Sequence, residues 1–284
     1  MSAPESEKAR RFYNSNTSLF LNFGHSSGGS IHRAVWAENI NNREAALHYV
    51  DEQLCRHLRT MGKEQDGQII DLGCGVGASL CYIANNLPVT GLGITISDKQ
   101  VQLATSLINQ HNLQKRIACI QGDYCDLPED LPRADLIFAI ESFVHGENPA
   151  SFFEQAAKLM KPGARLLICD DFINDTGLVN QAQSGSWIER FKQGWLIGSL
   201  LTADETDELA TQHELRLIED LDLSPWLELD RPRDKLIALL MKLLGKSALN
   251  FQYLRMLYGG NALQYCLQEG WLAYRLLVWE KPYE

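Results

Sequence analysis

The sequence has no excess of positive charge, because 26 Lys and Arg residues stand against 36 Asp and Glu residues and give a formal net charge of −10. Binding to a nucleic-acid backbone needs a dense basic surface, so this balance disfavours a nucleic-acid partner. The contents of hydrophobic residues (45%) and charged residues (22%) exclude collagen-like, disordered and coiled-coil chains. A chain of 284 residues is long enough for one globular domain with a substantial core.

Long apolar runs are also missing. A membrane-spanning helix needs about 18 consecutive apolar residues, and no such run occurs. The first residues, MSAPESEKARRFYNS, contain no apolar stretch of the signal-peptide type. The apolar segment 236–244 contains Lys242, and we expect it to be a core helix. The sequence therefore predicts a protein without stable membrane insertion.

The sequence lacks paired metal ligands. Its seven cysteines, at positions 55, 74, 81, 119, 125, 169 and 266, are odd in number and form no CxxC pair. His25 and His32 lie in a glycine-rich stretch without neighbouring carboxylates, so we expect no metal. Scattered reduced thiols fit the cytoplasm, where we expect the protein to act.

Strand and helix patterns alternate through the middle of the chain. The predicted strands are residues 68–71, 89–95, 118–121, 134–140 and 165–169, and the predicted helices between them are residues 78–86, 100–111 and 150–159. This alternation predicts an α/β fold, a doubly wound Rossmann-like sheet covered on both faces. A helix is expected at 41–58 and further helices within 175–215 and 230–270. Two late strands, 215–221 and 273–280, complete a mostly parallel sheet of seven strands.

A glycine turn, DLGCGVG, follows the first of these strands. Glycines at 73, 75 and 77 let the backbone approach a ligand closely at the start of a helix. A phosphate-binding P-loop is excluded because no lysine follows Gly77, and a dinucleotide site is weakened because Ala78 replaces the third glycine of GxGxxG. We favour S-adenosylmethionine, because the acidic Asp71 suits its cationic methionine part.

The segments DLGCGVG, GLGITIS, GDYCDLP and KPGARLLICDDF, in this order, resemble the landmarks of class I S-adenosylmethionine-dependent methyltransferases over about residues 65–175. The resemblance implies an enzyme with this cofactor. It also implies that Asp71, Gly73 and Gly75 hold the methionine part and that Asp123 and Tyr124 meet the adenine.

The second strand departs from the pattern of most members. They end it with an acid that binds both ribose hydroxyls, whereas GITIS places Thr95 and Ile96 there. TxSxxQ resembles a subset that includes the cyclopropane fatty acid synthases. By this resemblance, Gln100 is our candidate to take the place of the missing acid.

The segment AIESFVH places Glu141 and His145 after the fourth strand, at the edge where open α/β sheets bind ligands. It resembles the AIEATVH-type segment of sterol C-methyltransferases and the ES segments of tocopherol and geranyl diphosphate C-methyltransferases. A carboxylate can stabilise a carbocation, and an acid or a histidine can remove the proton that follows. Glu141, which we also expect near the cofactor, is the first catalytic candidate and His145 the second. Ordinary ion-pair or core positions are the alternative for both.

The flanking segments resemble substrate-covering parts of the same methyltransferases. Residues 12–36 resemble their aromatic-rich lid, which makes Tyr13 a cofactor candidate through cation–π attraction to the sulfonium, and Phe23 and His32 substrate candidates. Trp187, Phe191 and Trp195 form one helical face, either in the core or along an apolar substrate pocket. We divide the chain into an N-terminal helical lid with the first helix (1–60), a cofactor-binding core (61–174), and a helical insertion with the last strands of the same domain (175–284).

The sequence thus predicts a methyltransferase for a small, largely apolar metabolite, with C-methylation of an isoprenoid-like or other specialised metabolite as the leading hypothesis. O- or N-methylation is the first alternative. A cofactor-binding cyclase, or a binding protein that transfers no methyl group, is the second. The acceptor, diphosphate recognition and the oligomeric state, including a homo-oligomer, stay open.

Overall fold

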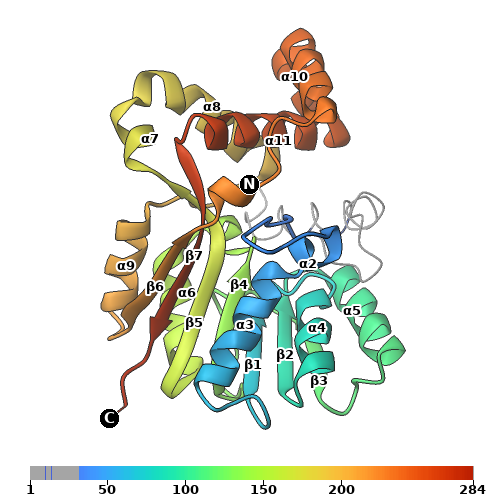
Figure 1. The fold of residues 1–284 in the computed structure, drawn as a ribbon, viewed down its shortest axis with the longest axis vertical. Coiled ribbons are helices and arrows are strands. Elements are labelled where there is room, and N and C mark those ends of the chain that lie inside the picture. The colour runs from blue at the N-terminus through green and yellow to red at the C-terminus, as the bar shows by residue number, and fades with distance from the viewer. Residues whose placement is uncertain (1–9, 11–13, 15–31, 284) are drawn as a thin grey trace, which may run out of the picture.

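The computed structural model describes Arg10, Asn14 and residues 32–283. The described residues form one seven-stranded sheet with the strand order β3-β2-β1-β4-β5-β7-β6 (Figure 1). Its strands are β1 (Gln68–Leu72), β2 (Thr90–Thr95), β3 (Ile117–Gln121), β4 (Ala134–Ile140), β5 (Met160–Ile173), β6 (Arg216–Asp222) and β7 (Leu272–Glu280). β7 runs antiparallel to β5 and β6, whereas the pairs among β1 to β5 are parallel. The predicted doubly wound, mostly parallel sheet is therefore confirmed.

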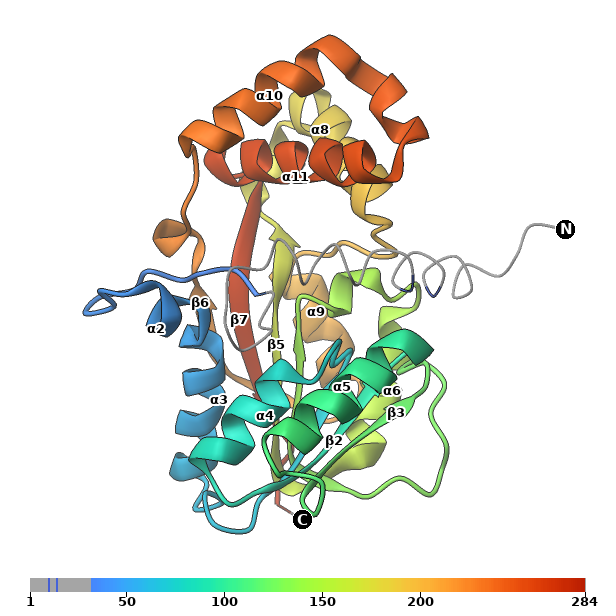
Figure 2. The ribbon, with the colours of Figure 1, turned by 90° about the vertical axis from the view of Figure 1, so that its right-hand side faces the viewer.

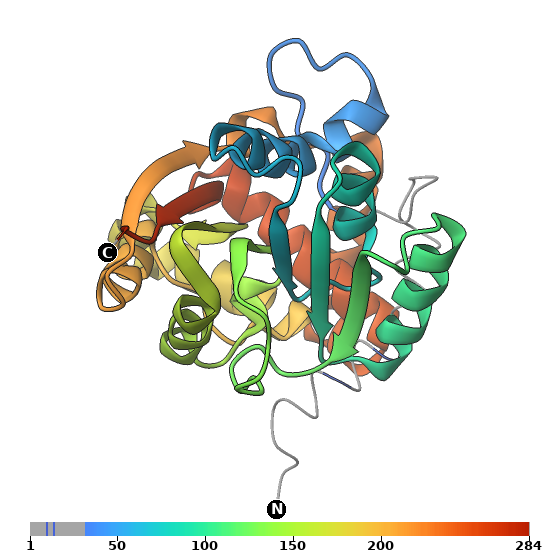
Figure 3. The same ribbon diagram turned by 90° about the horizontal axis from the view of Figure 1, so that it is seen from below.

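Helices cover both faces of this sheet (Figure 3). On one face lie α3 (Tyr49–Thr60), α4 (Ala78–Asn86) and α5 (Asp98–Gln110), and on the other lie α6 (Pro149–Leu159) and α9 (Ala203–Thr211). Neighbouring strand residues alternate between the two apolar layers, as Ile69 and Ile70 do. β4, ADLIFAI, is buried along its whole length, as expected of a central parallel strand.

Two predicted elements have different bounds in the structure. The helix expected at 41–58 is interrupted at His48, between α2 (Arg43–Leu47) and α3, and Asn42 caps α2 by accepting the backbone N–H of Ala45. β5 is much longer than residues 165–169, because it pairs with β7 from Arg165 opposite Glu280 to Ile173 opposite Leu272.

The remaining helices lie beyond the carboxyl ends of the parallel strands (Figures 1 and 2). They are α7 (Asp175–Val179) and α8 (Gln181–Trp195), before β6, and α10 (Pro232–Leu244) and α11 (Gln252–Gln268), between β6 and β7. α8 and α11 touch at two glycines, since a Cβ atom on Gly194 would lie 2.3 Å from the Cα atom of Gly259.

α10 is the outermost of these helices (Figure 2). Several of its leucines are exposed, so the prediction of a core helix at 236–244 is wrong. Among the described residues, no helix is both long enough and apolar enough to cross a bilayer.

Candidate active site

Two cavities meet at the carboxyl edge of the sheet. The turn cavity, about 440 Å³, lies between the glycine turn and the ends of β2, β3 and β4. The helix cavity, about 560 Å³, lies between the ends of β4 and β5 and the helices α8, α10 and α11. Four residues line both cavities: His32, Glu141, His145 and Trp195. A group in one cavity can therefore reach a group in the other at these side chains.

The glycine turn forms one wall of the turn cavity. Gly73, Gly75 and Gly77 have φ angles of 98°, 53° and 77°, in the left-handed region that favours glycine. A Cβ atom on Gly73 would lie 2.4 Å from the Cβ atom of Ser142, so this glycine permits close packing against the end of β4. A Cβ atom on Gly75 would have no other atom within 4 Å. Gly75 therefore borders open space that a ligand can occupy.

The opposite wall carries polar groups from the ends of β2 and β3. Thr95 donates its hydroxyl to Gln100 Oε1 at 2.6 Å, and both residues are buried. Tyr124 donates its hydroxyl to the backbone oxygen of Ser142 at 2.7 Å, and Asp123 accepts the backbone N–H of Cys125 at 2.9 Å. The turn cavity brings together these residues of the predicted cofactor site: Gly73, Gly75, Thr95, Ile96, Gln100, Asp123, Tyr124 and Glu141.

Of the predicted cofactor-binding residues that the structure describes, Asp71 alone does not line the turn cavity. It is 4% exposed beneath the turn, and burial raises the pKa of its carboxyl group well above the ordinary range. Tyr13 and Phe23 lie outside the described residues.

The charge of the turn cavity discriminates between cofactors. The charged residues among its described lining are Asp123, Glu141 and Glu147, with no Lys or Arg. An acidic cavity without a cation is unfavourable for the pyrophosphate of a dinucleotide. It fits a nucleoside that carries a cationic sulfonium and an ammonium group, and the open space at Gly75 gives room for this group. The residues present thus fit S-adenosylmethionine.

Glu141 occupies the boundary between the two cavities in a left-handed conformation, with a φ angle of 50°. Such a conformation is costly for a residue other than glycine and is often kept at functional sites. Glu141 Oε1 accepts hydrogen bonds from the Arg33 backbone N–H and the Tyr274 hydroxyl, both at 2.9 Å. Burial raises the pKa of Tyr274 well above its ordinary value, so its hydroxyl stays protonated and donates to Glu141. The carboxylate is therefore held in one orientation by two donors.

The two boundary histidines differ in environment. His145 ends the 3-10 turn η1 (Phe143–His145), and burial lowers its pKa to about 4. It is therefore neutral near pH 7, and it forms a hydrogen bond with the backbone of Leu196. His32 Nε2 lies 2.9 Å from the hydroxyl of Ser79, in the first turn of α4. Its buried Nδ1 atom has no hydrogen-bond partner among the described residues.

The sequence did not identify four residues beside Glu141: Arg33, Asp170, Asp171 and Tyr274. The Arg33 guanidinium lies 4.4 Å from the centre of the Tyr274 ring. Asp170 accepts the backbone N–H groups of Val144 at 3.2 Å and Asp171 at 2.9 Å, and its pKa is raised by burial and by the charge of Asp171. Two acids at the end of an apolar strand, in ICDDF, were the available signal for this cluster, whereas nothing in the sequence singled out Arg33 or Tyr274.

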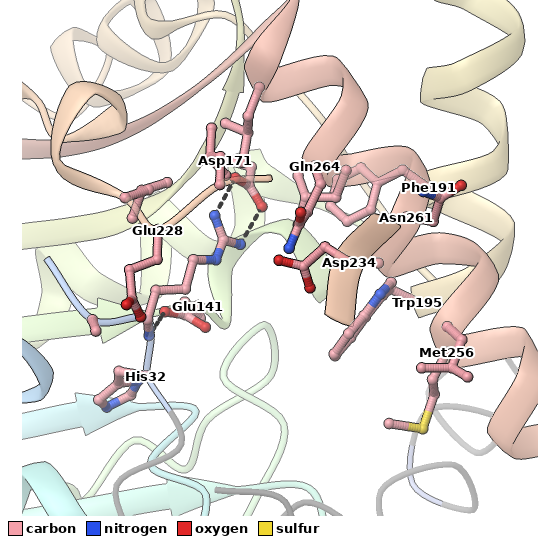
Figure 4. A pocket seen from close by; sticks show the side chains of 18 of the residues that line it. His32, Glu141, Asp171, Phe191, Trp195, Glu228, Asp234, Met256, Asn261 and Gln264 are labelled. Carbon is pink, nitrogen blue, oxygen red and sulfur yellow. Dashed lines mark hydrogen bonds and ion pairs between the residues drawn. The ribbon is translucent and has the colours of Figure 1, made fainter. Parts of the chain in front are cut away.

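The helix cavity is mostly apolar on the side formed by α8 and α11. Phe191 and Trp195 line it, and Figure 4 shows them across the cavity from Glu141 and His32. Trp187 does not line it, because this ring stacks on Tyr265 with centroids 4.3 Å apart. The predicted aromatic face is thus divided between the cavity and the contact of α8 with α11. Among the described residues, no cluster of three or more His, Cys, Asp or Glu suits a metal ion.

Known proteins resemble this chain in sequence and in fold. The profile of the family described as mycolic acid cyclopropane synthetase matches residues 18–241. An O-methyltransferase of Pyrenophora dematioidea is 27% identical over 221 residues, which cover 78% of this chain and 79% of that protein. O-methyltransferase cnsE of Penicillium expansum is 30% identical over 197 residues, covering 69% of this chain and 68% of that protein. Geranyl diphosphate C-methyltransferase from Streptomyces coelicolor A3(2), solved with Mg2+, geranyl diphosphate and S-adenosyl-L-homocysteine, has a similar fold, with a TM-score of 0.69, 16% identity and 99% of both chains covered.

Proposed function

The chain belongs to the mycolic acid cyclopropane synthetase family, and we propose that it methylates a small, apolar, uncharged acceptor held in the helix cavity. It is an S-adenosylmethionine-dependent methyltransferase of small molecules. The observation that carries the proposal is the wall shared by the two cavities, at His32, Glu141, His145 and Trp195.

The turn cavity is proposed to hold the donor. Bound S-adenosylmethionine supplies an electrophilic methyl group on its sulfonium. The glycine turn would border the methionine part, and the side-chain amide of Gln100, fixed by Thr95, would hold the ribose hydroxyls. Methyl transfer is an in-line displacement, so the protein mainly aligns the two reactants and excludes water. Trp195, which lines both cavities, supplies apolar surface where they meet.

The acceptor atom that we propose first is a hydroxyl oxygen. The two sequence relatives reported above are O-methyltransferases. In addition, two groups that can take the hydroxyl proton, Glu141 and the neutral His145, lie at the boundary between the cavities. Carbon, which the AIESFVH segment favours, is the second candidate, because a fixed carboxylate at Glu141 would also stabilise a carbocation.

An uncharged acceptor is favoured by the ion pairs of the helix cavity. Its arginines, Arg33, Arg43, Arg231 and Arg233, each lie within hydrogen-bond or ion-pair distance of a carboxylate, at 2.6 Å, 3.0 Å, 3.0 Å and 3.9 Å. A diphosphate would have to compete with Asp171, Glu228 and Asp234 for these cations. We therefore propose an isoprenoid-like or similar apolar metabolite without a diphosphate. The cytoplasm stays the proposed location, which the seven free cysteines support.

The proposal is tested by incubating the protein with S-adenosylmethionine that carries a 13C-methyl group and with pools of apolar alcohols, phenols and alkenes. S-adenosylhomocysteine should form with at least one pool, and the carbon NMR signal of the product distinguishes a methoxy from a C-methyl group. Glu141→Gln should lower kcat by about 10²- to 10⁴-fold, the range of general acid–base contributions. Cofactor affinity should also fall, because Glu141 is one of the three described acids that line the turn cavity, so kcat is measured at saturating cofactor. Glu154→Gln, an exposed acid on α6, is the matched control.

Three outcomes would overturn parts of this proposal. Cofactor binding without S-adenosylhomocysteine from any pool would favour a cyclase or a binding protein. Full activity of Glu141→Gln would remove Glu141 from the chemistry. A strong preference for diphosphate esters would contradict the uncharged acceptor.

A further inference from the structure

Exposed leucines gather on the outer face of α10. Leu236, Leu239, Leu240 and Leu243 are 68%, 57%, 38% and 77% exposed, and we call these four residues the leucine face. Their spacing of i, i+3, i+4 and i+7 is that of an apolar helix stripe, which in a globular protein normally faces the core. The inner side of α10 carries a separate apolar residue, Met241, which is buried. Among the residues that the structure describes, the leucine face is therefore not needed for packing.

Positive charge surrounds the leucine face. From the start of α10 to the end of α11, Pro232–Gln268, the chain has five basic residues and one acidic residue, a net charge of +4. The whole protein, in contrast, has a net charge of −10. Arg233, Lys235, Lys242 and Lys246 are all exposed. Arg233 lies 3.9 Å from a carboxylate oxygen of Asp234 and Lys235 lies 3.0 Å from one of Asp230, so Lys242 and Lys246 contribute most of the positive charge beside the leucine face. Apolar residues flanked by basic ones on an exposed helix are typical of segments that lie in the interface of an anionic membrane.

The position of α10 suits such a contact. It forms the outermost layer on the side of the molecule away from the sheet, with α11 beneath it (Figures 1 and 2). Both helices line the helix cavity, α10 with Ile237 and α11 with Met256 and Leu257. Tyr253, near the start of α11, lines this cavity and is also 43% exposed. Tyr253 thus links the exposed surface of these two helices to the helix cavity.

We propose that the leucine face and its basic residues dock the protein reversibly on an anionic lipid bilayer. The leucines enter the boundary between headgroups and acyl chains, and the three lysines meet the lipid phosphates. A second copy of this chain fits less well, because a symmetric contact through α10 would bring the exposed lysines of both copies together. Docking would give an acceptor dissolved in the bilayer a short path into the helix cavity, and this consequence rests on the proposed function.

The test is cosedimentation of the whole protein with vesicles of phosphatidylcholine alone and of phosphatidylcholine mixed with phosphatidylserine. Binding should occur with the anionic vesicles and weaken with added salt. Lys235→Glu, Lys242→Glu and Lys246→Glu should each weaken it about fivefold or more, the factor for one lysine near an anionic surface. Leu236→Ser with Leu243→Ser should weaken it roughly tenfold per leucine. Val179→Ser on α7, where the side chain is 83% exposed, is the matched control and should bind as the parent does.

The leucine variants change exposed side chains, so their thermal unfolding should match that of the parent. Equal sedimentation with and without vesicles would overturn the proposal, as would binding that the leucine and lysine variants retain. A dimer in analytical ultracentrifugation that the leucine variants abolish, without vesicle binding, would identify a second copy as the occupant. Titration of S-adenosylmethionine without lipid separates the two proposals, because lost cofactor binding contradicts the proposed function and leaves the docking result standing.

Discussion

Arg33 and Asp171 are joined by two parallel contacts, each guanidinium nitrogen lying 2.6 Å from a different carboxylate oxygen. Asp171 is 1% exposed near the end of β5, whereas Arg33 precedes the first described helix. The pair therefore ties the segment at Arg33 to the sheet. The same residue donates its backbone N–H to Glu141, so the ion pair also positions a donor to the boundary carboxylate.

Replacing Arg33 by Met should destabilise the protein strongly. The change leaves Asp171 buried without its cation, beside the buried Asp170, and breaking a buried pair in this way costs about 3–5 kcal/mol. Urea unfolding followed by circular dichroism measures the effect. The double variant Arg33→Met with Asp171→Leu removes both charges and should recover most of the loss. An unchanged unfolding midpoint for the single variant would show that the pair contributes little.

Alanine at Gly73 and at Gly75 should have different effects. At Gly73 the new Cβ atom meets Ser142 at 2.4 Å, and such overpacking costs about 1–3 kcal/mol of folding free energy. At Gly75 no other atom lies within 4 Å, so the backbone conformation alone should cost about 1–2 kcal/mol. The added methyl of Gly75→Ala occupies ligand space, however, and should weaken S-adenosylmethionine binding. Calorimetric titration and thermal unfolding separate the two effects, and normal affinity of Gly75→Ala would contradict this assignment.

The backbone strain at Glu141 is measurable through stability. Glu141→Ala keeps a Cβ atom at a φ angle of 50°, whereas Glu141→Gly relieves the strain, so the glycine variant should be more stable by about 1 kcal/mol. Both variants lack the carboxylate and should be similarly inactive. Chemical denaturation of the two proteins side by side gives the difference. A more stable alanine variant would indicate that the left-handed conformation relaxes without the glutamate.

The two buried histidines should each lower stability as the pH falls from about 6.5 to 4, whereas Asp71 and Asp170, whose pKa values burial raises, act in the opposite direction. Burial lowers the pKa values of His145 and His57 from 6.5 to about 4, so in this window the unfolded chain takes up protons that the folded protein does not. The contribution of each histidine is fully present above pH 6.5 and is lost as the pH falls toward 4. Denaturation midpoints across this range give the slope. The difference between the parent and His145→Asn, which does not titrate at this position, isolates the histidine: the variant should lose less stability than the parent between pH 6.5 and 4. The same pH dependence in both proteins would be incompatible with a neutral, buried His145.

The strands and the cofactor side of the site were predictable because their signals are local. Apolar runs between glycines predicted β1 to β4 closely, and the glycine turn, Thr95, Gln100, Asp123 and Tyr124 line one cavity as neighbours of those strand ends. The extent of β5 was not predictable from its own residues, because pairing with β7, about a hundred residues later, determines it.

The partners of Glu141 were beyond a reading of local patterns. Arg33 and Tyr274 are separated from Glu141 by 108 and 133 positions, and only the folded sheet brings them together. The leucines of α10 show the opposite case. Their helical spacing was visible in the sequence, but periodicity does not say whether an apolar stripe faces the core or the solvent.

The close contact between Gly194 and Gly259 has a consequence for how this family can diversify. The turn cavity is built mainly from the chain between β1 and α6, with His32 and Trp195 at its boundary, whereas the roof of the helix cavity comes from α8, α10 and α11. Of these helices, α8 and α11 cross at the two glycines. Substitutions in the roof at positions other than Trp195 can therefore alter the room for an acceptor without touching the residues around the donor. A lineage can in this way change what it modifies while inheriting its methyl source intact.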